Sequence, residues 1–214
     1  MPSLPDLRLY LVLGAADTGN RPFEEVALQA AEGGVTAVQL RDKHMPARDQ
    51  VAHAKRLKAL LAPRGVAVLV NDRVDVARAA DADGVHLGQT DLHPADARRL
   101  VGDSMVIGTS VHNTAEADAV DVESVDYIGL GPVATTSTKA DAEPAIGVEG
   151  VQRLRERVGL PAVAIGGVTA STAPALAATG VAGLAVISAI CGADDPAAAA
   201  GALRTAFEAA PVTG

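Results

Sequence analysis

Residues 66–87 read VAVLVNDRVDVARAADADGVHL, and they contain the unit that decides the fold. The β-branched run Val66–Val70 predicts a buried strand, and the alanine-rich run Val74–Ala80 predicts a short helix. The apolar run Gly84–Leu87 follows after a short turn and predicts a second strand. A strand, a helix and a strand in this order form a unit whose two strands lie parallel in one sheet.

The same alternation of short apolar runs and amphipathic runs extends over the whole chain of 214 residues. The predicted strands are Arg8–Leu13, Thr36–Leu40, Val66–Val70, Gly84–Leu87, Met105–Ile107, Tyr127–Leu130, Ala162–Ile165 and Leu184–Ile187. The predicted helices are Pro22–Glu32, Ala47–Leu61, Val74–Ala80, Pro94–Leu100, Thr114–Ala119, Val148–Val158, Ser171–Ala178 and Pro196–Ala209. Eight such units predict an α/β fold, a single (β/α)8 TIM barrel over residues 1–214, with the active site at the C-terminal ends of its parallel strands. A doubly wound open sheet is the alternative, but the count of eight and the lack of a Gly-x-Gly-x-x-Gly turn after the first strand favour the barrel.

The composition is typical of a globular protein with a mainly aliphatic core. Hydrophobic residues make up 49% of the chain, whereas aromatic residues make up only 2%. The formal net charge of −8 argues against a nucleic-acid or anionic-membrane partner, because either would need clustered lysine and arginine. Phosphorylated small molecules remain compatible with this charge if a local cationic pocket or a metal ion receives them. A homo-oligomer also stays open.

The chain shows no sign of secretion or of a membrane anchor. Cys191 is the only cysteine, so no disulfide can form within the chain. Met1–Asp6 lacks a basic region followed by an apolar region, which a secretory signal would need. Val158–Ala193 carries no charge, but Gly166-Gly167 and Pro174 interrupt it, which indicates buried strands and a helix rather than a transmembrane segment. These features predict a cytoplasmic protein.

Two kinds of charged side chain follow the predicted strands. After the second strand, alternation places Gln39, Arg41 and Lys43 on one face, where polar groups are costly unless they bind something. The alternative is that Arg41 pairs with a carboxylate such as Asp42 or Asp72. Asp72 and Asp91 follow neighbouring strands and could hold one Mg²⁺ together with substrate phosphates. The alternative for each aspartate is that it caps the helix that follows.

Phosphate-binding features lie further along the chain. The loop Gly131–Lys139, GPVATTSTK, ends in four hydroxyl side chains, Thr135–Thr138, and a lysine, which suit phosphate oxygens. The last two predicted strands end at Gly166-Gly167 and at Ile187-Ser188, where barrels of this type frequently bind a phosphate. Ser110 after the fifth strand is weak evidence alone. A solvated polar loop and a plain tight turn are the structural alternatives.

In this order the motifs resemble those of the thiamine phosphate synthase family. The matching segments cover nearly the whole chain and are Gln39–Lys43, Asn71-Asp72, Gly84–Asp91, Gly108–Ser110, Gly131–Lys139, Gly166-Gly167 and Val186–Ser188. Ala134 and Thr135 depart from the family, which usually has a large apolar residue at the first position and often proline or glutamate at the second. Neither change removes a phosphate-binding group.

The resemblance implies a transferase of thiamine biosynthesis with Mg²⁺ as cofactor. Such an enzyme condenses 4-amino-2-methyl-5-(diphosphooxymethyl)pyrimidine with 4-methyl-5-(2-phosphooxyethyl)thiazole, or its carboxylated form, to thiamine phosphate and diphosphate. The implied pyrimidine diphosphate site consists of Gln39, Leu40, Arg41, Asp42, Lys43, Asn71, Ser110 and Lys139. The implied thiazole phosphate site consists of Thr136, Ser137, Thr138, Gly167, Ile187 and Ser188. Asp72 and Asp91 would bind the metal, and Arg41, Lys43 and Lys139 would be catalytic.

The chemistry of these substrates suggests a dissociative reaction. The electron-rich aminopyrimidine can stabilise the cation left when diphosphate departs, and the thiazole nitrogen can trap it. The protein then has to neutralise the leaving group and exclude water rather than supply a nucleophile. We hypothesise that the loop Thr135–Ile146, which carries Lys139, closes over the mouth as a lid.

Two other functions remain open. A thiazole tautomerase-like paralogue would share the fold and the thiazole phosphate site, and His112 could be its acid or base, although a histidine in an exposed loop is the simpler interpretation. A non-catalytic sensor of phosphorylated ligands would bind the thiazole phosphate without releasing diphosphate. The presence of the diphosphate and metal residues argues against the tautomerase; these are Arg41, Lys43, Asp72, Asp91 and Lys139.

Overall fold

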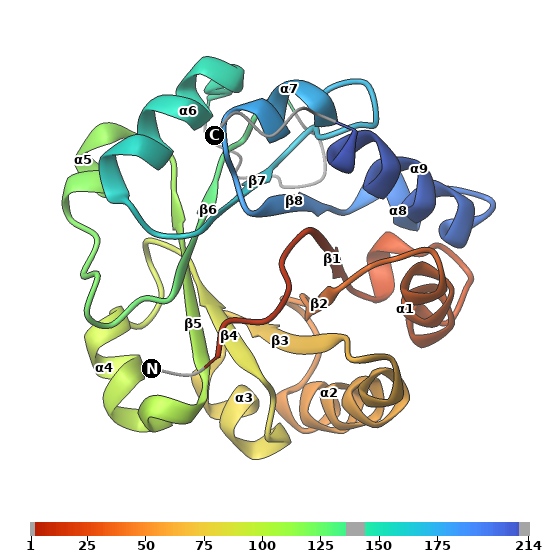
Figure 1. The fold of residues 1–214 in the computed structure, drawn as a ribbon. Helices are drawn as coiled ribbons and strands as arrows, with labels where there is room; N and C mark the ends of the chain where they lie inside the picture. Colours follow the sequence, from red (N-terminus) through yellow and green to blue (C-terminus); the bar gives the residue numbers. More distant parts are fainter. Residues whose placement is uncertain (1–2, 136–143, 210–214) are drawn as a thin grey trace.

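The eight predicted strands form a closed parallel barrel in the order of the chain (Figure 1). The computed structural model describes residues 3–135 and 144–209. The strands are β1 (Leu9–Leu13), β2 (Ala37–Leu40), β3 (Ala67–Asn71), β4 (Gly84–Leu87), β5 (Val106–Val111), β6 (Tyr127–Leu130), β7 (Ala162–Ile165) and β8 (Gly183–Val186). Parallel pairing of β1 with β8, in which Leu9 lies opposite Leu184, closes the ring. The predicted TIM barrel is therefore confirmed.

Helices surround the barrel on the outside (Figure 1). They are α1 (Phe23–Glu32), α2 (Ala47–Leu61), α3 (Val74–Ala80), α4 (Pro94–Val101), α5 (Thr114–Asp118), α6 (Gly147–Val158), α7 (Ala173–Ala178), α8 (Ser188–Cys191) and α9 (Pro196–Glu208). Three short 3-10 turns, η1 (Ala15–Asp17), η2 (Ala62–Arg64) and η3 (Gly102–Ser104), complete the elements of the described residues. None of the helices in this part of the chain combines the length and apolarity that a membrane crossing needs.

The sequence-based boundaries were wrong in two places that matter for the site. β5 runs on to Val111, whereas the predicted strand stops at Ile107. The short helix α8 directly follows Ile187, whereas no helix was predicted there. Gly108 has low strand propensity and interrupts the local pattern, whereas pairing with β6 continues the strand there. The four residues of α8 are too few to show a helical period in the sequence.

Two apolar layers hold the barrel together. Outward-facing residues such as Leu9, Leu11 and Leu13 pack in the layer between strands and helices. Inward-facing residues such as Tyr10 and Tyr127 form a second cluster inside the barrel. Every strand except β4 contributes to both layers, because successive side chains point to opposite faces.

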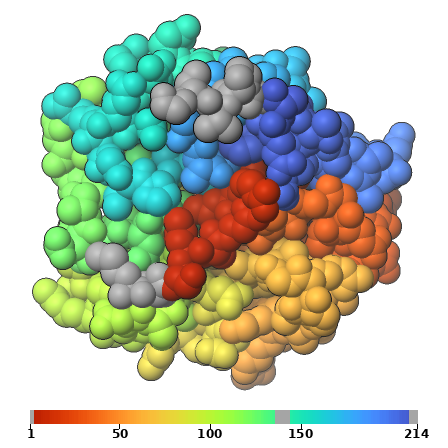
Figure 2. Space-filling view, viewed as in Figure 1, coloured from red at the N-terminus to blue at the C-terminus, as the bar shows by residue number. Residues whose placement is uncertain are grey.

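The N-terminal segment covers one end of the barrel. Leu4 and Leu7 join the cluster inside the barrel, and Leu7 is only 3% exposed. Figure 2 shows this segment, in red, lying across the centre of the molecule's face. A ligand therefore has to enter from the opposite end, where the strands finish.

Candidate active site

A cavity of about 380 Å³ opens at the C-terminal ends of the strands. It brings together ten of the residues that the sequence singled out, which are Gln39, Arg41, Lys43, Asn71, Asp72, Asp91, Ser110, Gly167, Ile187 and Ser188. They come from segments spread over most of the chain, and they share only their position after, or at the end of, a parallel strand. The geometry of a parallel barrel is therefore what assembles the site.

Two predicted site residues do not line the cavity. Leu40 is 1% exposed and packs in the layer between strands and helices, because it points opposite to Gln39. The carboxylate of Asp42 turns away and accepts hydrogen bonds from the backbone N–H groups of His44 at 3.0 Å and Met45 at 2.9 Å. The side chains of Leu40 and Asp42 therefore support the neighbouring residues rather than face a ligand.

Four other predicted residues, Thr136, Ser137, Thr138 and Lys139, lie outside the described residues. The same holds for most of the segment on which the lid hypothesis rests, since only Thr135 and residues 144–146 of it are described.

The loop after β2 brings two cations to the mouth of the cavity. The backbone N–H of Arg41 donates to the carbonyl of Leu13 at 2.8 Å, so the strand pairing continues beyond β2 and keeps Arg41 and Lys43 on the same face as Gln39. Within the described residues Arg41 forms no ion pair, so the pairing with Asp42 or Asp72 that the sequence left open is not found. Arg41 lines the cavity instead.

Asp72 and Asp91 lie beside these cations, after the neighbouring strands β3 and β4. Burial and the neighbouring carboxyl group of Asp91 together raise the pKa of Asp72 to about 6, although the charges of Lys43 and Arg41 oppose the shift. Asp91 also accepts a hydrogen bond from the backbone N–H of Gly88 at 2.7 Å. Two carboxylates this close favour either a shared proton or a bound cation.

Neither aspartate caps the following helix. The N-cap of α3 is Arg73, and the N-cap of α4 is His93, whose ring accepts a hydrogen bond from the N–H of Ala95. Asp72 has a left-handed backbone with φ 62°, which aspartate tolerates better than most residues. The capping alternative is therefore wrong for both, and their carboxylates are left to face the cavity.

Removing the charge of Asp72 should stabilise the metal-free protein. The folded pKa of about 6 lies above the ordinary value of 3.8, so the folded state holds a proton that the unfolded state loses between these two pH values. Protonated Asp72 does not destabilise the fold below pH 3.8. The free energy of unfolding then falls as the pH rises from 3.8 to about 6, and the full destabilisation by the charged carboxylate remains above pH 6. With EDTA at pH 8, Asp72→Asn should melt about 3 °C higher than the parent, the shift that ~1 kcal/mol causes in a domain of this size.

Two comparisons check this result by scanning calorimetry or dye fluorescence. The gain should shrink as the pH approaches 4, and Asp75→Asn, which removes an exposed carboxylate paired with Arg73, should show no gain. A lower melting temperature of Asp72→Asn at pH 8 would contradict the repulsion between the two carboxylates.

A tight backbone turn forms the opposite wall. Gly166 and Gly167 have positive φ values of 89° and 70°, and a Cβ on Gly167 would lie 2.8 Å from the Cβ of Ala134. The N–H of Ala134 donates to the carbonyl of Gly166 at 3.0 Å, which links the loop after β6 to the loop after β7. The small side chain of Ala134 fits this close approach, so its departure from the family pattern leaves the wall intact.

The sequence left the aromatic floor of the cavity without a role. Tyr10 and His86 line the cavity, and Tyr127 lies directly beneath them, hydrogen-bonded to both. All three lie at inward-facing positions of predicted strands, where a polar side chain could have indicated a functional site. His112 also lines the cavity, and its Nδ1 lies 2.8 Å from Oε2 of Glu116.

Comparison with known proteins places these features in a family. The family model described as "Thiamine monophosphate synthase" matches residues 9–190. The chain belongs to this family. Among curated relatives, the thiamine-phosphate synthase of Xanthobacter autotrophicus is 50% identical over 98% of this chain and 100% of its own length. That of Azorhizobium caulinodans is 47% identical over 97% of this chain and 98% of its own length.

Solved structures agree with the thiamine monophosphate synthase family. The thiamine phosphate pyrophosphorylase of Pyrococcus furiosus superposes with a TM-score of 0.86, is 38% identical and covers 95% of this chain and 96% of its own. A 3-hexulose-6-phosphate synthase reaches a TM-score of 0.67 at 20% identity, covering 94% of this chain and 100% of its own, and shows the shared barrel alone.

Proposed function

We propose that the protein is a thiamine phosphate synthase, a transferase that joins the pyrimidine diphosphate to the thiazole phosphate and releases diphosphate. The observation that carries the proposal is the pairing at one cavity mouth of two cations, Arg41 and Lys43, with two adjacent carboxylates, Asp72 and Asp91. A diphosphate with a bound divalent cation needs both kinds of group. The names of the curated relatives support the same activity.

The adjacent carboxylates fit Mg²⁺. Hard oxygen ligands suit this ion, which usually takes one or two protein carboxylates and completes its shell with water and substrate phosphates. The raised pKa of Asp72 shows that two negative charges are unfavourable in this partly buried site. A bound divalent cation would neutralise them and remove that energetic cost. Asp72 and Asp91 would hold the ion, and when bound it would neutralise charge on the departing diphosphate. Among the described residues no cluster of three or more acidic, histidine or cysteine side chains offers a fuller shell, so water and substrate oxygens would complete it.

The reaction needs positioning and charge more than it needs a protein nucleophile. The bond between the pyrimidine methylene carbon and the diphosphate oxygen breaks, and its electron pair leaves with diphosphate. The lone pair of the thiazole nitrogen then forms the new carbon–nitrogen bond. Arg41 and Lys43 stabilise the leaving group, whereas the wall around Gly167, with Ser188, holds the thiazole phosphate so that its nitrogen lies near the reacting carbon.

One assay tests this function. Purified protein, both phosphorylated substrates and Mg²⁺ should give thiamine phosphate and an equal amount of diphosphate, and omission of any component should abolish both products. Formation of neither product by the complete mixture would contradict the proposed function.

The same assay decides between the synthase and the alternatives. The His112–Glu116 contact at the cavity favours a tautomerase-like paralogue as second candidate, because the carboxylate can orient the ring for proton transfer. Such a protein would change the thiazole phosphate alone, without diphosphate release. A sensor would bind the thiazole phosphate and change neither compound.

A further inference from the structure

A continuous chain of hydrogen bonds crosses the inside of the barrel below the cavity. Nε2 of Gln39 donates to Oη of Tyr10 at 2.8 Å, and Oη of Tyr10 lies 3.1 Å from Oη of Tyr127. Oη of Tyr127 lies 2.9 Å from Nδ1 of His86, and Nε2 of His86 lies 3.0 Å from Oγ of Ser110. Gln39 and Ser110 both line the cavity, so the chain starts and ends at the site.

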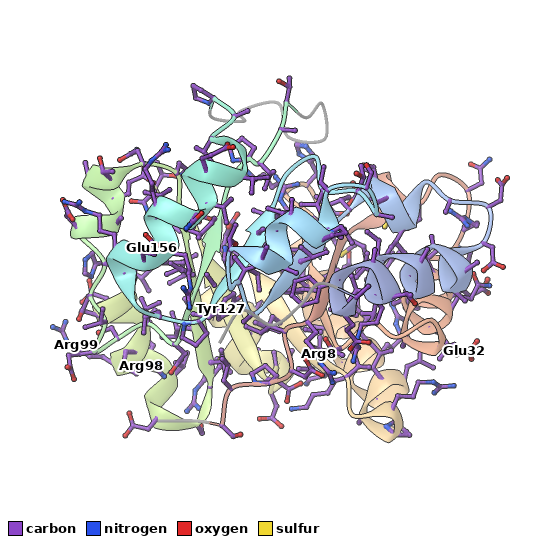
Figure 3. All side chains as sticks on the ribbon, turned by 45° about the horizontal axis from the view of Figure 1, so that its top comes forward. Arg8, Glu32, Arg98, Arg99, Tyr127 and Glu156 are labelled. Carbon is purple, nitrogen blue, oxygen red and sulfur yellow. The ribbon has the colours of Figure 1, made fainter. Side chains whose placement is uncertain are left out.

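Glycines on the neighbouring strands leave space for the rings of Tyr127 and His86, which belong to this chain of hydrogen bonds. A Cβ on Gly108 would lie 2.2 Å from Cζ of Tyr127, and a Cβ on Gly129 would lie 3.1 Å from Cε1 of His86. Tyr127 is 0% exposed, and Figure 3 shows it among the strands. Burial raises the pKa of Tyr127, so its hydroxyl stays protonated and needs partners inside the protein.

With Nε2 of Gln39 facing Tyr10, the hydrogens along the chain can run in one direction only. Each tyrosine hydroxyl has a single hydrogen to donate. Oη of Tyr10 already accepts from Gln39, and within the described residues Oη of Tyr127 is the one acceptor for its hydrogen. Tyr127 therefore accepts from Tyr10 and donates to Nδ1 of His86. In the reverse direction Tyr10 would accept twice, and its own buried hydrogen would lack a partner, which folded proteins avoid.

This direction decides the proton of His86 and then the hydrogen of Ser110. Because Nδ1 accepts from Tyr127, His86 carries its proton on Nε2 and donates it to Oγ of Ser110. Ser110 has no second side-chain hydrogen-bond partner among the described residues, so its own hydrogen is left for an acceptor in the cavity.

We propose that Tyr127 is a positioning residue, which holds His86 as the Nε2–H tautomer and thereby aims the hydroxyl hydrogen of Ser110 at an acceptor nitrogen of the aminopyrimidine substrate. The identity of the acceptor rests on the proposed function, whereas the tautomer does not. A serine that could otherwise accept or donate is thus committed to donation. This favours a ring that presents a lone pair over one that presents an N–H.

The tautomer is measured on the substrate-free protein by 15N NMR of labelled histidine, with the His86 signal assigned from a His86→Asn sample. We expect the proton on Nε2 in the parent and its partial or full transfer to Nδ1 in Tyr127→Phe. Tyr10→Phe is the matched control, because it removes a buried hydroxyl from the same chain yet leaves His86 as the acceptor for Tyr127. It should keep the Nε2–H form. A parent His86 that carries its proton on Nδ1, or on both nitrogens, would overturn the proposal even if Tyr127→Phe fails to fold.

A double-mutant cycle separates this role from a structural one. Tyr127→Phe should lower kcat/KM about tenfold in the parent, as expected for one weakened hydrogen bond in the transition state. The same substitution in a Ser110→Ala background should change kcat/KM less than about twofold, because Tyr127 acts through Ser110. An equal loss in both backgrounds would contradict the proposal. Absence of product from the parent would refute the proposed function, and the NMR result would still decide the tautomer.

Discussion

Arg41→Gln is expected to lower the kcat of thiamine phosphate formation by about 10²-fold or more. Arg41 faces the cavity and forms no ion pair within the described residues, so its charge is available to the diphosphate. Loss of one preorganised group that stabilises charge in the transition state costs on the order of 10²–10³ in rate. The loss should fall mainly on kcat, because the leaving group gains charge only as the bond breaks. Steady-state kinetics with both substrates measure it.

Two control variants sharpen this result. Arg41→Lys keeps the charge but loses the planar fork, so it should recover part of the lost rate. Arg99→Gln removes an exposed arginine of α4 that pairs with Asp96 and lies on the outer surface, and it should leave kcat unchanged (Figure 3). A parent-like kcat for Arg41→Gln would remove Arg41 from the reaction.

Asp72→Asn is expected to raise the Mg²⁺ concentration for half-maximal rate by at least about tenfold, which corresponds to ~1.4 kcal/mol for one lost carboxylate ligand. Asparagine keeps the size of the side chain and tolerates the left-handed backbone at this position, so the change is one of charge. The KM for the thiazole phosphate should change little, because its proposed site lies at Gly167 on the opposite wall. Metal titrations of the rate at fixed substrate concentrations provide the measurement.

The melting temperature gives a readout of the metal that does not depend on turnover. Mg²⁺ should raise the melting temperature of the parent and leave that of Asp72→Asn nearly unchanged. Asp75→Asn, on the exposed side of α3, should respond to Mg²⁺ as the parent does. Equal losses of metal response and thiazole phosphate binding in Asp72→Asn would instead indicate a structural role for Asp72.

The sequence predicted the positions of the strands and the end of the barrel that holds the site, because both follow from local patterns. Alternation along Gln39–Lys43 placed Gln39, Arg41 and Lys43 on one face, and all three line the cavity. Leu40 was nevertheless predicted to be a site residue, although alternation points it to the opposite face. The resemblance had carried over the whole segment, and the structure places the side chains of Leu40 and Asp42 elsewhere.

Other features depend on contacts between distant segments, which local patterns do not contain. β5 extends beyond Ile107 because β6 pairs with it, and Ser110 lies opposite Gly129. The capping role of Asp72 and Asp91 was plausible from spacing alone, and only the loop geometry excludes it. The proposed positioning role of Tyr127 also depends on distant segments, because it rests on a neighbouring glycine of β5 and on hydrogen-bond partners from β1 and β4.

A crystal structure of the protein soaked with Mg²⁺ and diphosphate tests the central claim most directly. We expect the metal at the carboxylates of Asp72 and Asp91. We expect the diphosphate to contact this metal and also Arg41 and Lys43. Diphosphate bound away from these four side chains, or a metal bound without either aspartate, would contradict the account.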